Sequence, residues 1–450
     1  MELISEYFVK PKHEVLASKN PIYLTPVDIQ ALRFNPTQRG LLYNYTLDQS
    51  TSSTILDIID TLKESLSISL IHFYPLAGRL VTETFTDENA CSVFIDCNKG
   101  PGARLTHVVV PGVTKLDILS PNHVPVIVKK FFEFGEEILN YDGHTRPLLA
   151  IQVTELVDGV FIGFTTNHCV VDGTSSTHFL NMLSEIFCSN NASEKLLEIS
   201  RVPVFEHGPC IKLPRLRLEE IITRRRMTSP LQDRVFHFSA ASMAMIKAQA
   251  NKNGSILNVS SFQGLSSLIW RAITRARNLS TDQETVCCMT INARPRLDPP
   301  LSDNYFGNYI SLFKVISKVD ELLGHDYDWA AMRLNDGIKA LDDKSIRSTL
   351  NSIAQLLSME ITTSKPNLED VFHGPNGVLI GGSARFDIYG LEFGLGKVVV
   401  VRMGLGNKSD GKITAHPGRE ENGSVDLEVS LKEEHMASLE MDHKFMSFAS

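Results

Sequence analysis

A stretch rich in proline and charge, residues 191–230, separates two halves of the chain that have a similar make-up. Each half mixes amphipathic helical patterns with apolar or alternating strand patterns, and these follow one another without a regular strand–helix–strand spacing. A chain of 450 residues is also too long for one ordinary hydrophobic core. We therefore expect an α/β protein with mixed sheets, with domains at 1–190 and 231–450 and a crossover linker at 191–230.

Hydrophobic periodicity gives the positions of several elements. Apolar residues recur with the helical period of 3.6 in two segments, 54–70 and 260–277. Continuous or alternating apolar runs indicate strands at 148–156, 160–167 and 397–404. These five segments anchor the fold prediction.

Charge and composition exclude several classes of protein. The formal net charge is −8, so the chain lacks the basic field of a nucleic-acid binder, and Arg224–Arg226 is typical of a solvated loop. The N-terminal residues carry charges where a signal peptide needs an apolar run, and no stretch reaches membrane-spanning length. Seven cysteines without a C-x-x-C pair fit a reducing compartment. We expect a cytoplasmic protein that binds neither nucleic acid nor membrane and holds no metal.

The sequence TTNHCVVDGTSS contains the strongest candidate for a catalytic group. Strands 148–156 and 160–167 flank a Val-Asp-Gly turn and predict a hairpin, which places His168 directly after its second strand. After Gly173 the apolar residues follow a helical stripe, with Thr174 or Ser175 available as the N-cap. A short polar connection between a strand and a helix is a common place for functional side chains.

An imidazole at this position has two interpretations. Histidine titrates near neutrality and is the usual general base for a hydroxyl or amine nucleophile. Asp172, four residues further on, can orient the loop by pairing with a basic residue elsewhere. A structural histidine satisfied within a turn fits the same residues. The chain has no G-x-S-x-G, H-E-x-x-H or helix-opening G-x-G-x-x-G motif, which leaves transfer or elimination assisted by an acid or base.

Five segments, in order, resemble the BAHD family of plant acyl-CoA-dependent acyltransferases. They are YPLAGRL with CNKGPGARL, HCVVDG, SSFQGLSSLIWRAITRAR, INARPRLDPPLSDNYFGN and LEFGLGK, at residues 74–105, 168–173, 260–277, 291–308 and 391–397. The resemblance covers essentially the whole chain.

The resemblance implies two domains like those of chloramphenicol acetyltransferase, with a channel between them. Acyl-CoA would enter this channel as a co-substrate from one face and a small-molecule acceptor from the other, with no permanently bound cofactor and a monomeric protein. His168 would be the catalytic base. Asp172 and Gly173 would support the site, and Arg294 or Arg296 would be the arginine that pairs with Asp172.

Two further segments would lie near this channel. Residues 304–308 would contribute substrate-binding groups, Asn304 among them, and residues 260–267 would lie close by. A simple turn and a capped helix are the alternative interpretations of the same residues.

One motif departs from the family pattern. The family sequence D-F-G-W-G is replaced here by Glu392, Phe393, Gly394, Leu395 and Gly396. The family tryptophan can offer an indole N–H to a developing oxyanion, whereas leucine has no donor. Assistance to the oxyanion must therefore come from another residue or be missing.

Arg385 has two interpretations, and two functions other than acyl transfer also remain open. In some hydroxycinnamoyltransferases of the family an arginine in this region binds an acceptor carboxylate, although here a salt bridge with Asp387 explains Arg385 equally well. The chain also resembles a divergent branch related to the lyase that splits isochorismoyl-glutamate, a reaction that needs neither CoA nor the tryptophan. We expect acyl transfer first, such an elimination second, and a non-catalytic partner protein third.

Overall fold

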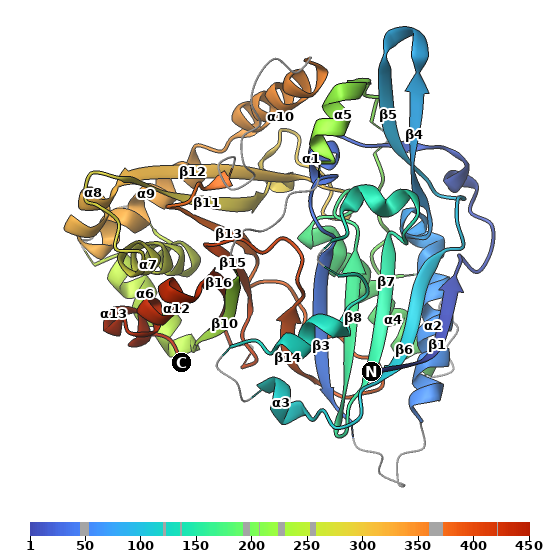
Figure 1. Ribbon diagram of the computed structural model, residues 1–450, viewed down its shortest axis with the longest axis horizontal. Coiled ribbons are helices and arrows are strands. Elements are labelled where there is room, and N and C mark those ends of the chain that lie inside the picture. The colour runs from blue at the N-terminus through green and yellow to red at the C-terminus, as the bar shows by residue number, and fades with distance from the viewer. Residues whose placement is uncertain are drawn as a thin grey trace.

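The structure, a computed structural model, describes the chain except residues 46–53, 120–122, 136, 192–198, 207, 224–229, 253–257, 360–371 and 421. Two six-stranded sheets lie side by side, with helices packed on them (Figure 1). Each large sheet combines parallel and antiparallel pairs of strands. The predicted α/β class with mixed sheets is confirmed.

The first large sheet contains the predicted hairpin. Its strands, in spatial order, are β1 (Glu2–Val9), β6 (Ala103–Val109), β7 (Leu149–Glu155), β8 (Gly159–Thr166), β3 (Thr37–Asn44) and β14 (Val398–Met403). Strands β7 and β8 pair antiparallel, as the Val-Asp-Gly turn predicts.

Strand β14 differs from the predicted division of the chain. It belongs to the half assigned to residues 231–450, yet it pairs antiparallel with β3 of the first half. Without β14, the β3 edge would expose unpaired backbone N–H and C=O groups. The strand pattern of residues 397–404 predicts the strand correctly but contains no information about its partner.

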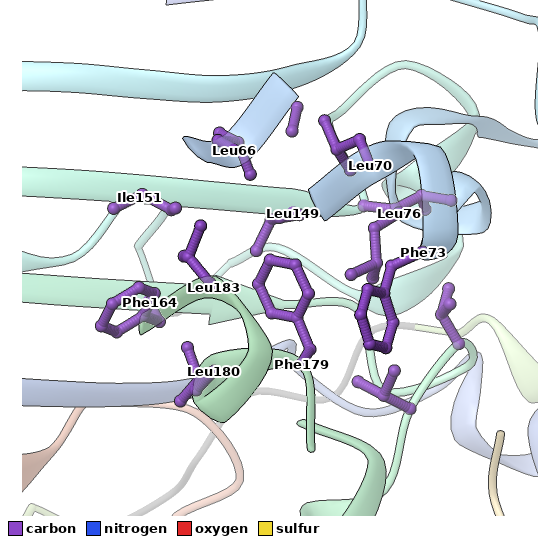
Figure 2. Close-up of a cluster of buried hydrophobic side chains, with 14 of the residues drawn as sticks. Leu66, Leu70, Phe73, Leu76, Leu149, Ile151, Phe164, Phe179, Leu180 and Leu183 are labelled. Carbon is purple, nitrogen blue, oxygen red and sulfur yellow. The ribbon is translucent and has the colours of Figure 1, made fainter. Parts of the chain in front are cut away.

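The first core lies between this sheet and two helices, α2 (Ile55–His72) and α4 (Gly173–Asn191). The helices of the first half are α1 (Pro26–Ala31), α2 (Ile55–His72), α3 (Lys115–Leu119) and α4 (Gly173–Asn191). Helix α2, predicted at 54–70, starts with a capping box in which Thr54 and Asp57 each bond the other's backbone. Figure 2 shows Phe179 and Leu183 of α4 packed against Leu149 of β7. The helix that follows His168 is therefore fixed by burial of its apolar face.

The second large sheet carries the other main core on one face. Its strands, in spatial order, are β10 (Leu231–Phe238), β16 (Val425–Lys432), β15 (Lys412–Pro417), β13 (Val378–Gly382), β11 (Glu284–Asn292) and β12 (Ile310–Lys318). The helices after the crossover are α6 (Ala240–Ala250), α7 (Ser261–Ala276), α8 (Val319–Gly324), α9 (Tyr327–Lys339), α10 (Asp343–Ser358), α12 (Glu433–Glu440) and α13 (His443–Met446). Helix α7 confirms the prediction at 260–277.

The two faces of the second sheet differ in polarity. On β15, Ile413 and Ala415 are buried in the core beneath the helices. The alternate residues Lys412, Thr414 and His416 point to the opposite face, because successive strand residues alternate. This polar face is turned toward the first half, since the end of β14 contacts β16 through a hydrogen bond from the Met403 N–H to Glu428 Oε2 (3.1 Å).

The described part of the crossover is not a free linker. It contains β9 (Leu213–Pro214) and α5 (Arg215–Ile221), and β9 pairs with β5. Strand β5 belongs to a small sheet formed by β2 (Ile22–Tyr23), β5 (Ala90–Asp96), β4 (Arg79–Phe85) and β9. The prediction of a solvated loop at Arg224–Arg226 falls outside the described residues.

Candidate active site

His168 lies directly beyond the end of β8, and its backbone is held from two sides. Its N–H donates to Asn140 Oδ1 (2.9 Å), from the short helix η5 (Asn140–His144). Its carbonyl accepts from Asn308 Nδ2 (2.6 Å), from the segment before β12. Two residues from distant parts of the chain therefore fix the backbone that carries the imidazole.

The His168 side chain is half-buried. Its buried Nδ1 atom makes no hydrogen bond to a described residue. Burial lowers the pKa of His168 from its ordinary value, and the positive charge of Lys412 acts in the same direction. A lowered pKa keeps the imidazole neutral near pH 7, which is the form that accepts a proton.

Asp172 does not orient the imidazole but joins the two halves. Its Oδ2 atom lies 2.7 Å from Arg294 Nη1, and both side chains are almost completely buried. Asp172 Oδ2 also accepts from the Tyr309 N–H (3.0 Å), and Oδ1 accepts from the Ser175 N–H (2.9 Å). Asp172 is therefore the N-cap of α4, and the prediction of Thr174 or Ser175 in that position is wrong. The N-cap lies earlier than predicted because the Asp172 carboxylate accepts a hydrogen bond from the α4 backbone and pairs with Arg294 at the same time.

Arg294 extends this connection. Its Nη2 atom donates to Ser175 Oγ (3.0 Å) and to the carbonyl of Gly307 (2.8 Å). Arg296, the other arginine considered for Asp172, instead donates to the carbonyls of Ile338 and Leu341 at the end of α9. The two arginines lie in one 3-10 turn, η6 (Arg294–Arg296), where residues two positions apart point in different directions.

Asn304 is tied to the crossover rather than to the site. Its Oδ1 atom accepts from Arg201 Nε (3.1 Å), and its carbonyl accepts from the Val204 N–H (2.8 Å). Asn308, four residues later, is the amide that contacts the His168 backbone. The sequence predicted that segment 304–308 lies near the site. It could not show which of Asn304 and Asn308 contacts His168, because the direction of each side chain depends on the conformation of the turn.

Asp28 is a buried acid that sequence reasoning missed. Asn308 Nδ2 donates to Asp28 Oδ1 (2.7 Å), and the capping box of α1 brings Thr25 to the other carboxylate oxygen. Burial raises the pKa of Asp28 to about 6. In the sequence, Asp28 is indistinguishable from any helix-capping aspartate. In the fold, it positions Asn308 and through it the carbonyl of His168.

The E-F-G-L-G segment packs into the first core. Phe393 is completely buried against the rings of Tyr43, Phe164 and Phe187. Leu395 is 6% exposed and belongs to the same core. The side chain at position 395 therefore packs in the first core, shortly before β14 begins.

The backbone of this segment is fixed by polar contacts. Ser184 Oγ of α4 accepts from the Glu392 N–H (2.8 Å) and donates to its carbonyl (3.0 Å). Glu392 Oε1 accepts from the Gly396 N–H (3.2 Å). Gly394 and Gly396 adopt φ angles of +72° and +76°, in the left-handed region that favours glycine.

Arg385 is exposed and forms no ion pair with a described acid. The alternative partner, Asp387, accepts from the N–H of Gly390 instead (3.2 Å). The neighbouring Phe386 faces the His168 motif, because a Cβ atom at Gly173 would lie 3.3 Å from its ring. The loop that carries Arg385 therefore contacts the start of α4.

Lys412 is a second residue that the sequence did not single out. It lies on the polar face of β15, next to Gly381 of β13, and its Nζ makes no hydrogen bond or ion pair with a described residue. Burial lowers its pKa to about 8, and its charge acts on His168. Strand periodicity applied to KITAHP would have placed Lys412 on a polar face, but not opposite His168.

Within the described ranges, no cluster of His, Cys, Asp and Glu side chains has the arrangement of a metal site. None of the described helices is both long and apolar enough to span a membrane.

His168 therefore lies at a strand exit, opposite the polar face of a second mixed sheet. A family model described as the Transferase family matches residues 1–446. The chain is 32% identical to an uncharacterized acetyltransferase of Arabidopsis thaliana, over 98% of both chains. It is 30% identical to the BAHD acyltransferase DCR of the same plant, over 99% of this chain and 92% of the relative. The protein belongs to the BAHD family and is an acyltransferase.

Solved structures show the same fold at lower sequence identity. Vinorine synthase is 20% identical, with a TM-score of 0.74, over 100% of this chain and 98% of that one. Fusarium graminearum TRI101, solved with coenzyme A and T-2 mycotoxin, is 20% identical, with a TM-score of 0.71, over 96% and 99%. The expected fold of the chloramphenicol-acetyltransferase type is confirmed.

Proposed function

We propose that the protein transfers an acyl group from acyl-CoA to the hydroxyl or amine of a small plant metabolite, with His168 as the general base. The observation that carries this proposal is the position of His168 at the exit of β8, where Asn140 and Asn308 fix its backbone and burial lowers the pKa of its imidazole. Coenzyme A bound to TRI101 supports the thioester donor. Relatives named shikimate O-hydroxycinnamoyltransferase and omega-hydroxypalmitate O-feruloyl transferase support a small acceptor.

The reaction follows from the charges around His168. The imidazole takes the proton of the acceptor as its oxygen or nitrogen attacks the thioester carbon. The tetrahedral oxyanion then collapses, the carbon–sulfur bond breaks, and the proton passes to the leaving thiolate. The positive charge of Lys412 acts on His168 from the second sheet, and a cation close to a developing oxyanion favours the transition state. Asp172 and Arg294 hold the loop in place without contacting the substrate.

Mass spectrometry tests this function directly. Wild type and His168→Ala are incubated with plant small-molecule extract, with and without a mixture of acyl-CoAs. We expect an acylated product that requires the thioester and falls by about 10²–10⁴-fold in His168→Ala. Arg215→Gln, on the surface of α5, is the matched control and should keep full activity.

Two other outcomes have defined meanings. If an extract metabolite is consumed without any acyl-CoA, elimination replaces transfer as the function. If no metabolite changes under either condition, the partner-protein alternative gains support. A monomeric state and a cytoplasmic location also remain predictions, which size-exclusion chromatography and cell imaging can test.

A further inference from the structure

Asp28 and Asn308 form a buried polar chain that ends at His168. Asn308 Nδ2 donates one hydrogen to Asp28 Oδ1 (2.7 Å) and the other to the carbonyl of His168 (2.6 Å). Asn308 is 2% exposed and Asp28 is 7% exposed, so these contacts are shielded from water. Both donors of the amide are therefore used, one by a carboxylate and one by the backbone of the histidine.

Asp28 fixes the direction in which the Asn308 amide lies. Burial raises the pKa of Asp28 to about 6, so its carboxylate is ionised near pH 7 and only accepts hydrogen bonds. The reversed amide would place its oxygen against two other acceptors, Asp28 Oδ1 and the His168 carbonyl, with no donor between them. An ionised Asp28 therefore excludes the reversed amide.

The amide oxygen of Asn308 and the ring of His168 hold matching unpaired atoms. Asn308 Oδ1 and His168 Nδ1 are both buried, and neither makes a hydrogen bond of standard geometry to a described residue. Burial lowers the pKa of His168, whereas hydrogen bonding to its own backbone and to the Asn308 side chain acts in the opposite direction. Groups that raise the pKa of a histidine by hydrogen bonding face the ring as acceptors. Asn308 therefore favours a proton on the ring nitrogen that it faces.

The position of this proton decides which nitrogen of His168 is a base. The side chain is half-buried while Nδ1 is buried, so Nε2 is the nitrogen that can meet a substrate. A neutral imidazole carries one proton, and when Nδ1 holds it, Nε2 has the free lone pair. With the amide of Asn308 reversed, its NH₂ group would face the ring and favour the other tautomer, in which Nε2 carries the proton and cannot accept one.

A second capping box in the same chain separates this role from helix capping. Asp28 caps α1 together with Thr25, and Asp57 caps α2 together with Thr54. In both boxes Oδ2 of the aspartate accepts from the threonine N–H at 2.8 Å. Oδ1 of Asp28 has Asn308 as a further partner, whereas Asp57 is exposed. Substitution of Asp57 therefore changes a helix cap without touching the site.

We propose that Asp28 is a positioning residue that fixes the tautomer of His168 through the amide of Asn308. The ionised carboxylate orients the amide, and the amide oxygen together with the His168 carbonyl holds the proton on Nδ1. Nε2 then remains free to take a proton from the substrate. This inference rests on the proposed role of His168 as general base and adds the residue that prepares the imidazole for it.

Nitrogen NMR of protein with labelled histidines reads the tautomer, because protonated and bare ring nitrogens differ in chemical shift. The His168 signals are identified by their loss in His168→Ala, at about pH 8, where the imidazole is neutral. Wild type should carry the proton on Nδ1. Asp28→Asn can donate or accept at position 28 and should give a mixture of both tautomers, whereas Asp57→Asn should match wild type. Asn308→Leu, which removes the amide, should also weaken the preference for Nδ1.

Steady-state kinetics test whether the tautomer matters for turnover. In Asp28→Asn, kcat should fall about 10-fold or more with little change in KM, because a misplaced proton removes the base without removing a contact to substrate. Asp57→Asn should keep the wild-type kcat. In the Asn308→Leu background, Asp28→Asn should lower kcat no further, because Asp28 acts through Asn308. Melting temperatures of all variants show whether each one folds.

Two results would overturn the inference. One is a proton that stays on Nδ1 in Asp28→Asn to the same extent as in wild type. The other is a fall in kcat from Asp28→Asn that is as large in the Asn308→Leu background as in wild type, which would mean that Asp28 acts by another route. The NMR measurement needs no substrate. Failure of the proposed transfer reaction would appear in the comparison of wild type with His168→Ala and can be recognised separately.

Discussion

The positive charge of Lys412 acts on His168 from the opposite sheet. It disfavours the imidazolium form of His168 and so lowers the pKa of the imidazole. Lys412→Met should therefore raise this pKa. In the proposed mechanism His168 acts as a base only when neutral, so activity should be lost as pH falls through its pKa. The acid limb of the kcat/KM profile should move to higher pH in Lys412→Met.

Lys412→Arg is the control for this prediction, since it retains a cation at the same position. Its acid limb should stay close to that of the wild type. An acid limb that is the same in all three proteins would show that Lys412 does not act on the base.

Asp172 and Arg294 form an ion pair with both side chains almost completely buried. Arg294→Met removes one partner and leaves a buried carboxylate without its counter-charge, which costs about 3–5 kcal/mol. Urea unfolding should show this loss in the free energy of unfolding. The double variant Asp172→Asn/Arg294→Met should recover part of it. A loss below about 1 kcal/mol in Arg294→Met would contradict the structural role of the pair.

Leu395 shows that the E-F-G-L-G loop is a packing element. The resemblance suggests that a tryptophan at this position would restore a donor for the oxyanion. Because Leu395 is buried in the first core, Leu395→Trp should instead overpack that core and cost about 1–3 kcal/mol, without raising kcat. Leu395→Met, which conserves volume, is the control. A gain in kcat for Leu395→Trp would mean that position 395 reaches the reacting thioester.

The two halves are not independent, because β14 completes the sheet of the first half. A fragment of residues 1–230 lacks this strand and also lacks Phe393, whose removal from a core costs about 3–5 kcal/mol. We expect this fragment to aggregate through the open β3 edge when expressed alone. Co-expression with residues 231–450 should give a stable complex on size-exclusion chromatography. A monomeric fragment that unfolds cooperatively would contradict this prediction.

Local sequence determined the elements and the place of His168. The periods of 2 and 3.6 predicted the β7–β8 hairpin, α2 and α7, because side-chain alternation follows directly from backbone geometry. The same reasoning put His168 at a strand exit. The predicted N-cap of α4 differs from the observed one by two or three residues. The observed cap, Asp172, also pairs with Arg294, which lies 122 positions away.

Only the tertiary structure decided which residues act together. His168 contacts Asn140 and Asn308 and is influenced by the charge of Lys412, which lie 28 to more than 200 positions away. The pairing of Asp172 with Arg294 instead of Arg296 also joins distant segments. Periodicity is a property of a few consecutive residues, whereas pairing and burial are properties of the whole fold.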